Sequence, residues 1–206
     1  MQRKILTTAA LFVLSTGVAF AATPHPYAGA GYGTTDMDSG VSGLTGSASV
    51  DEKDNGYRVF GGMDFGNNFS AEVAYSRWDN AAILDANAGD MFRFDGTTYQ
   101  VLANGAKIDL DGYSVALSGR YTFPLTNQFG IFAKAGLHSW KFDTTTSAPG
   151  LGSFRDSFSG TDLLYGGGAG FKLTPHLSAD VQYERYDLSE GLNHLDMITG
   201  NLAYHF

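Results

Sequence analysis

The segment HLSADVQYERYDL at positions 176–188 alternates between apolar and polar side chains along most of its length. In an extended conformation the apolar residues share one face: Leu177, Ala179, Val181 and Tyr183. The polar face carries the residues between them: Ser178, Asp180, Gln182, Glu184 and Tyr186. This period of two predicts a β-strand that is apolar on one side only. Soluble β-sandwiches show the same pattern, so the rest of the chain must distinguish the two classes.

The same alternation recurs along the chain and predicts eight strands. Their expected ranges are 27–35, 56–65, 69–78, 111–123, 128–142, 162–173, 176–187 and 194–206. Each strand is long enough to cross a bilayer at a tilt, which takes roughly 9–11 residues. No apolar run after the first 21 residues reaches the roughly 18 residues that a membrane-spanning helix needs.

The predicted connections alternate in length. Short turns of typical turn-forming residues occupy 65–68, 124–127 and 174–175, whereas the links 36–55, 79–110 and 143–161 are long and 188–193 is shorter. Outer-membrane barrels have short turns in the periplasm and long loops outside the cell. The sequence therefore predicts an all-β protein, an eight-stranded antiparallel up-and-down transmembrane β-barrel.

Charge and composition narrow the class further. The chain has 206 residues and a net charge of −8, which argues against binding nucleic acid because phosphates attract basic surfaces. It has no cysteine, which excludes a disulfide framework and a thiolate metal site. Most acidic residues fall in the four links, whose basic residues are Lys53, Arg93, Lys107 and Arg155. We therefore expect acidic extracellular loops on a nearly neutral barrel.

The first 21 residues resemble a secretory signal peptide. Arg3 and Lys4 are basic, residues 5–20 are mostly apolar, and Ala19-Phe20-Ala21 is a small-residue cleavage pattern. An uncleaved membrane helix is the alternative, but the apolar run is short for a span. The expected domains are a signal peptide at 1–21 and an outer-membrane barrel at 22–206.

Strand phasing predicts a charged barrel interior. If Val59, Val73, Val115, Ile131, Phe171 and Val181 face lipid, charged side chains of both signs point inward. They are Arg58, Asp64, Glu72, Arg120, Lys134, Lys172, Asp180 and Glu184. Buried charges are tolerated when they are paired, so we expect an ion-pair network that fills this narrow barrel.

Several segments resemble the transmembrane domain of the outer membrane protein A family. They are residues 70–75, 120–140 with Phe123-Pro124-Leu125-Thr126, 173–183, and the final Leu202-Ala203-Tyr204-His205-Phe206. The resemblance extends over essentially all of the chain after the leader and implies the barrel domain alone. It also implies that Tyr204 and Phe206 form the carboxy-terminal signal read by the barrel-assembly machinery.

The resemblance implies a gate inside the barrel. Glu72 and Arg120 match the family's central ion pair, and Lys134 matches an inward arginine on the fifth strand. The family's inward glutamate on the seventh strand is Gln182 here, with Glu184 two residues further along. The last strand has no inward arginine to match the family's alternative partner for the gate.

The leading functional hypothesis is a structural and surface-interaction protein with acidic extracellular loops. A narrow gated channel is the alternative. We expect no enzyme activity: alternation sends His138 and Ser139 to opposite faces, and His194 near the outer rim lacks a placed nucleophile. We expect no cofactor or metal, and we expect Trp78 and Trp140 to pack in an interfacial girdle or at the rim. The expected partners are outer-membrane lipid, lipopolysaccharide and the barrel-assembly machinery. We expect the protein to be a monomer that is integral to the bacterial outer membrane.

Overall fold

The computed structural model describes residues 24–150 and 152–206, so the predicted signal peptide lies outside the described residues. In that part of the chain no helix is both long and apolar enough to cross a membrane. The described residues form strands joined by turns and loops. The strands are β1 (His25–Asp38), β2 (Ser49–Asp51), β3 (Lys53–Asp64), β4 (Phe69–Ala86), β5 (Met91–Phe94), β6 (Thr97–Gln100), β7 (Ala106–Pro124), β8 (Phe129–Ala148), β9 (Gly152–Lys172), β10 (Leu177–Asp187) and β11 (His194–His205).

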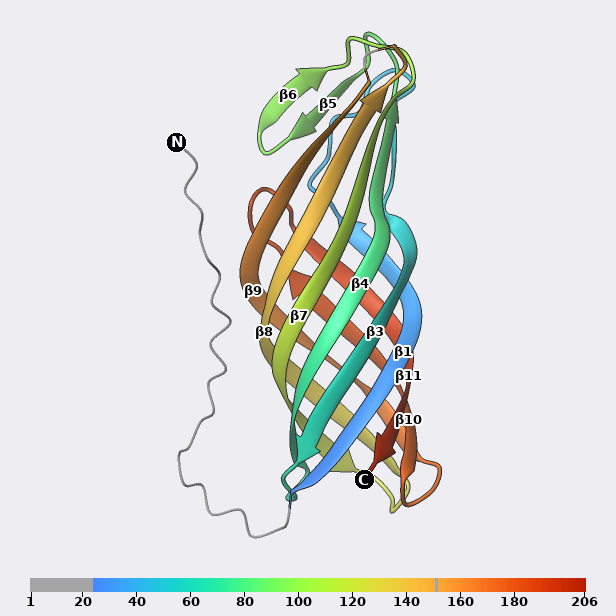
Figure 1. Cartoon of the computed structure of the whole chain (residues 1–206), viewed down its shortest axis with the longest axis vertical. Helices are drawn as coiled ribbons and strands as arrows, with labels where there is room; N and C mark the ends of the chain where they lie inside the picture. The colour runs from blue at the N-terminus through green and yellow to red at the C-terminus, as the bar shows by residue number, and fades with distance from the viewer. Residues whose placement is uncertain (1–23, 151) are drawn as a thin grey trace.

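Eight of these strands close into an antiparallel barrel (Figure 1). The hydrogen-bonded order is β3-β1-β11-β10-β9-β8-β7-β4, and β4 pairs with β3 to close the ring. The first and last barrel strands meet through Tyr27 opposite His205 and Asp38 opposite His194. The predicted fold class is therefore confirmed. Closure leaves no unpaired strand edge within the ring, as a lipid environment requires.

The short turns lie together at one end of the barrel, the end where β11 also finishes (Figure 1). The turn between β3 and β4 uses Gly66, Asn67 and Asn68, all with positive φ. Glycine and asparagine adopt this left-handed conformation most easily, which explains the tight reversal.

The outer face of the barrel is apolar where the strands would cross lipid. Val59, Val73, Leu117, Leu163 and Val181 are each at least half exposed. Tyrosines flank this band toward the loop end: Tyr32, Tyr57, Tyr113 and Tyr183. Phe69, Tyr121, Phe123, Phe129, Phe171, Tyr204 and Phe206 flank it toward the short turns. The predicted phase of the strands is confirmed, and the aromatic girdles mark both interfaces.

Four neighbouring strands are longer than predicted. β4, β7, β8 and β9 continue past the other strands toward the loop end and form a tall sheet (Figure 1). The ranges 79–110 and 143–161, expected to be loops, therefore contain strand extensions and the β5–β6 hairpin. The predicted strands are too short because the prediction required outward-facing side chains to be apolar. Beyond the membrane that face turns polar, as Thr145 and Ser157 show, while apolar Ile108 and Leu110 remain inside.

Candidate functional site: an ion-pair ring inside the barrel

Four charged side chains from four strands meet in the centre of the barrel. Arg58 comes from β3, Glu72 from β4, Lys134 from β8 and Glu184 from β10. Each charged side chain is at most 2% exposed. Side chains at even separations along a strand share a face. Each of these four residues lies two or four positions from a residue that faces the lumen, so its side chain also points inward.

The four charges alternate in sign around a closed ring. The Arg58 guanidinium contacts Glu72 at 2.5 Å and Glu184 at 3.1 Å. The Lys134 ammonium contacts the same two carboxylates at 2.6 and 2.7 Å. Each cation therefore touches two anions and each anion two cations. This arrangement lets four buried charges coexist, because a single unpaired charge at this depth would be expelled or neutralised.

Neutral donors complete the ring. Tyr27 donates its hydroxyl hydrogen to Glu72 at 3.3 Å. Gln182 and Tyr186 each donate to the same oxygen of Glu184, at 2.9 and 3.0 Å. Gln182, the position where the resemblance implies a glutamate, thus supports the carboxylate of Glu184 two residues further along. Hydrogen-bonded networks of this kind make the interior of a barrel rigid, although the Nε atom of Arg58 is buried without a hydrogen-bond partner among the described residues.

The predicted pair between Glu72 and Arg120 is wrong. On the neighbouring strands Glu72 lies opposite Ser118, while Arg120 lies opposite Ser70. Arg120 is therefore displaced by two residues, roughly 7 Å, toward the short turns. There it contacts Asp180 at 3.2 Å and lies over the ring of Phe132 at 3.5 Å. Lys134, whose side chain reaches toward the loop end, occupies the place beside Glu72 instead.

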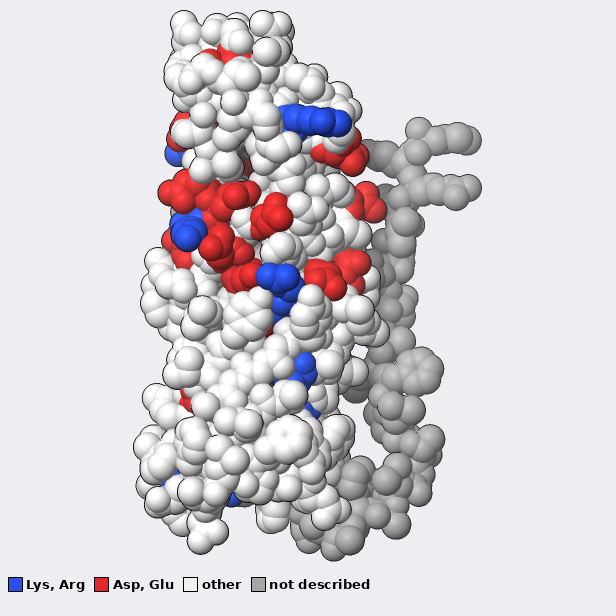
Figure 2. Space-filling model, turned by 180° about the vertical axis from the view of Figure 1, so that it is seen from behind, with Lys and Arg blue, Asp and Glu red and all other residues white. Residues whose placement is uncertain are grey.

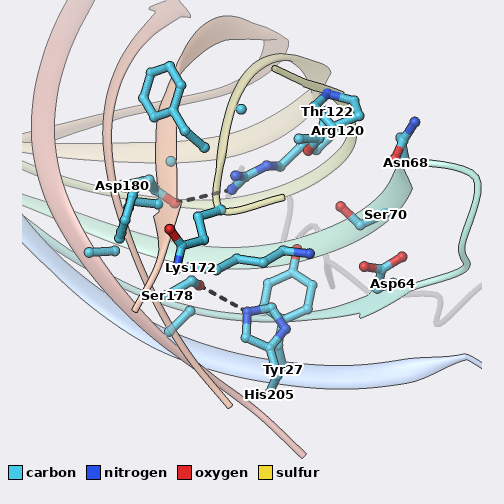
Figure 3. Close-up of a pocket in the computed structure, with 18 of the residues that line it drawn as sticks. Tyr27, Asp64, Asn68, Ser70, Arg120, Thr122, Lys172, Ser178, Asp180 and His205 are labelled. Carbon is cyan, nitrogen blue, oxygen red and sulfur yellow. Dashed lines mark hydrogen bonds and ion pairs between the residues drawn. The ribbon is translucent and has the colours of Figure 1, made fainter. Parts of the chain in front are cut away.

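Below the ring a polar cavity opens at the short-turn end (Figure 3). Its volume is about 440 Å³, and Arg120, Asp180, Lys172, Asp64 and His205 are among its lining residues. Ser178 and His205 are joined by a hydrogen bond of 2.9 Å, and Asn201 donates to Asp180 at 2.7 Å. Of the eight predicted interior charges, four form the ring, two form the Arg120–Asp180 pair, and Asp64 and Lys172 lie along this periplasmic vestibule.

Above the ring an aromatic layer fills the lumen. Trp78, Trp140, Phe142 and Tyr186 are each at most 1% exposed and pack with Met37, Leu195 and Met197. Trp78 stacks on Phe142 and meets Tyr186 edge-on, with ring centroids 5.5 and 5.0 Å apart. The expectation that the two tryptophans belong to an interfacial girdle or rim is therefore wrong. The sequence contains the information that was missed: Trp78 lies an even number of positions from Glu72 on β4, so both side chains point into the lumen.

The histidines and acids do not assemble a further chemical centre among the described residues. His138 is buried and bonds Ser114 and the backbone oxygen of Asp187, whereas Ser139 is exposed on the outer face. His194 approaches Asp196 at 3.9 Å. Within residues 24–150 and 152–206, no three acidic or histidine side chains gather as metal ligands do.

Lipid-facing walls, paired aromatic girdles and an ion-pair ring at the centre of the lumen are the features of a small outer-membrane barrel. The sequence places it within a known group: residues 6–206 match the model of the outer membrane protein beta-barrel domain. The chain belongs to that family, which confirms the family-level resemblance and assigns it to the bacterial outer membrane.

Individual relatives agree with this assignment. Over 70 residues the chain is 29% identical to outer membrane protein A of Shigella flexneri, an alignment covering 34% of this chain and about a fifth of that protein. Neisserial surface protein A shares the fold with a TM-score of 0.57 at 14% identity, covering 90% of this chain and 100% of the other. Ail of Yersinia pestis, solved with the heparin analogue sucrose octasulfate, gives 0.51 at 17% identity, covering 89% and 97%. The likenesses to these two solved structures, both below 25% identity, support the fold alone.

Proposed function

We propose that the protein is a closed membrane anchor whose function lies on its extracellular surface. The supporting observation is the ion-pair ring, because Arg58, Glu72, Lys134 and Glu184 occupy the centre of the lumen and satisfy one another. The aromatic layer above it adds a second barrier. A barrel filled in this way leaves the strand extensions and loops as the part that can meet other molecules.

The outward-facing charges near the loop end suggest what that surface meets. Four ion pairs lie on the outer side there, three of them exposed and Arg185–Asp196 partly buried: Lys53–Asp36, Arg77–Asp79, Lys141–Asp143 and Arg185–Asp196. Asp51, also exposed there, has no ion-pair partner among the described residues. In the view of Figure 2, red acidic side chains form a broad band across the molecule with few blue ones between them.

The register concentrates this negative charge. Asp36 lies directly opposite Asp196 on the neighbouring strand, although each also contacts a base, Lys53 and Arg185 respectively. Like charges that face each other across strands are destabilising unless a cation lies between them. We propose that divalent cations link this acidic band to the phosphates of lipopolysaccharide, so that the barrel binds into the outer leaflet as a monomer and strengthens it.

The test uses the refolded chain in vesicles with or without lipopolysaccharide. Magnesium should raise the thermal unfolding midpoint in lipopolysaccharide vesicles, and EDTA should reverse this. The double variant Asp36→Asn/Asp51→Asn should lose most of the effect. Asp95→Asn/Asp156→Asn, which neutralises two exposed acids in the hairpin and the β9 extension, is the matched control. An equal magnesium response in both variants would contradict the proposed lipid contact.

A narrow channel is the second candidate. It is favoured by the vestibule of about 440 Å³, which leads from the periplasmic end toward the ring. Opening would require the four charges to exchange partners, and the extra carboxylate hydrogen bonds from Gln182 and Tyr186 oppose this. Single-channel recording of the chain and of Glu72→Gln separates the candidates. We expect a silent bilayer for the unchanged chain, whereas stable openings that the substitution alters would favour the channel.

A further inference from the structure

A second cavity lies in the extracellular part, on the far side of the aromatic layer from the ring. Its volume is about 320 Å³. Leu84, Ile108 and Phe158 line it from the strand extensions, and Phe92 and Phe94 line it from β5. Leu110 and Leu192 connect it to the buried cluster that contains the two tryptophans. Small-molecule sites have volumes of about 300–1,000 Å³, so this cavity suits a small ligand.

The cavity stands clear of the membrane. Along β4, Leu84 lies seven residues beyond Arg77, whose outward ion pair with Asp79 is exposed. The register of β4 against β7 shifts between these two residues, but their partners on β7, Tyr113 and Ile108, are five extended residues apart, which is roughly 16 Å. The apolar walls therefore cannot be explained as a lipid-facing surface. Apolar space of this size, in the part of the protein that is surrounded by water, is suited to an apolar molecule.

The polar groups of the cavity are few and uncharged. The Thr144 hydroxyl is buried and has no hydrogen-bond partner among the described residues. Ser39, by contrast, already accepts a hydrogen bond from the backbone N–H of Val41 at 3.3 Å. Among the described residues, no charged side chain lines the cavity. A buried hydroxyl without a partner gains from one hydrogen bond, while a charged ligand would lose its hydration without compensation.

One wall of the cavity is a small hairpin. Phe92 of β5 stacks on Tyr99 of β6 with ring centroids 5.4 Å apart, and Tyr99 is 46% exposed. The hairpin is attached through Ser42 and Thr45, which hydrogen-bond with Arg93 and Met91, and through Asp90, which accepts hydrogen bonds from Ser47. Two-stranded hairpins have little stability of their own. The β5–β6 hairpin is thus the wall that can move aside, while the strand extensions hold the other walls in place.

We propose that this cavity binds an uncharged, linear aliphatic molecule of medium length that carries one hydroxyl group. The aliphatic part lies against Leu84, Ile108 and Leu110, and the ligand hydroxyl hydrogen-bonds with Thr144. The molecule enters from the extracellular side beside the β5–β6 hairpin. The site is independent of the acidic band, and its ligand need not cross the ion-pair ring.

The experiment is photolabelling of the refolded full-length chain in detergent micelles. The probe is a ten-carbon alcohol with a diazirine in its chain, and labelled peptides are identified by mass spectrometry. Peptides around residues 84–110 and 144–158 should label saturably, and excess 1-decanol should compete. Decanoate should compete much less at neutral pH. Lipid-facing positions such as Val181 serve as the internal reference, because their labelling from the micelle should not saturate.

Two substitutions separate specific binding from partition into detergent. Leu84→Trp should fill the cavity and abolish saturable labelling. Thr144→Val retains the shape and removes the hydroxyl, so 1-decanol should compete about fivefold less well while decane competes as before. Heat-shifted gel mobility establishes that each variant folds, and Thr144→Val decides the question if Leu84→Trp does not fold. Labelling confined to lipid-facing positions, or unchanged by Thr144→Val, would overturn the proposal.

Discussion

The membrane-spanning barrel and the sheet that β4, β7, β8 and β9 form beyond its loop end are built from the same strands with opposite polarity. In the barrel the outer face is apolar and the lumen contains buried ions. In the extension the outer face carries residues such as Thr145 and Ser157, and the inner face carries Ile108 and Leu110. The pairing of β7 with β8 and of β8 with β9 continues across the boundary, whereas β4 and β7 change register between Trp78 and Ala82. The surrounding solvent therefore determines which face of a strand is apolar.

Removing one charge from the barrel interior should have the largest effect on stability. Glu72→Ala leaves Arg58 and Lys134 facing each other with only Glu184 between them. Breaking a buried ion pair typically costs about 3–5 kcal/mol. Urea unfolding in lipid vesicles, followed by gel mobility, measures the loss. Asp64→Asn, in the periplasmic vestibule, is the control and should change stability little; equal losses in the two variants would mean that the ring is not stabilising.

A lysine introduced on the outer face should distinguish the two regions directly. Leu163→Lys and Ser157→Lys alter the same face of β9, six residues apart. Leu163 is 57% exposed on the lipid-facing side, where a lysine near the midplane costs about 2–4 kcal/mol. Ser157 faces water, so its substitution should cost less than about 0.5 kcal/mol. The same unfolding assay applies, and similar costs at both positions would place the membrane boundary elsewhere.

The anchoring of the β5–β6 hairpin should depend on pH. Hydrogen bonds from the backbone N–H of Asn87, then from the Ser47 hydroxyl and N–H, hold the pKa of Asp90 below its usual range. The stabilisation is present above the pKa of the unfolded carboxyl and is lost as pH falls through the lower folded value. Hydrogen exchange of residues 87–101, normalised to an unstructured peptide, should therefore accelerate in acid below about pH 4. Asp90→Asn should abolish this dependence, and an unchanged profile would contradict it.

The exposed ion pairs should show the smallest effect. Arg77 and Asp79 contact each other at 2.7 Å, with side chains 39% and 54% exposed. Solvent and salt screen such pairs, so Arg77→Gln should cost about 0.2–1 kcal/mol. Unfolding at low and high salt measures this difference, which should vanish at high salt. A loss comparable to that of Glu72→Ala would show that exposed and buried pairs do not differ as argued.

The sequence predicted the strand number, the phase and the inward charges because lipid imposes a simple rule on the outer face. It did not predict which charges pair. Glu72 was assigned to Arg120, but pairing depends on cross-strand register and on side-chain reach, as the contact with Lys134 shows. The two tryptophans were misplaced because their position near strand ends was weighed above their parity. The β5–β6 hairpin is too short to produce a recognisable alternation, so the extracellular cavity had no signal in the sequence.

The ion-pair ring also has a consequence for how the chain enters the membrane. Its members lie on β3, β4, β8 and β10, which are not all neighbours around the barrel. A partly formed sheet would leave cations without their anions and expose them to hydrocarbon, at a cost of several kcal/mol per ion. Half-inserted intermediates are therefore unfavourable, and the charges become tolerable only when the last strand pairs with the first. Insertion and ring closure are thus coupled into one cooperative event, and the buried charges penalise misregistered or open forms.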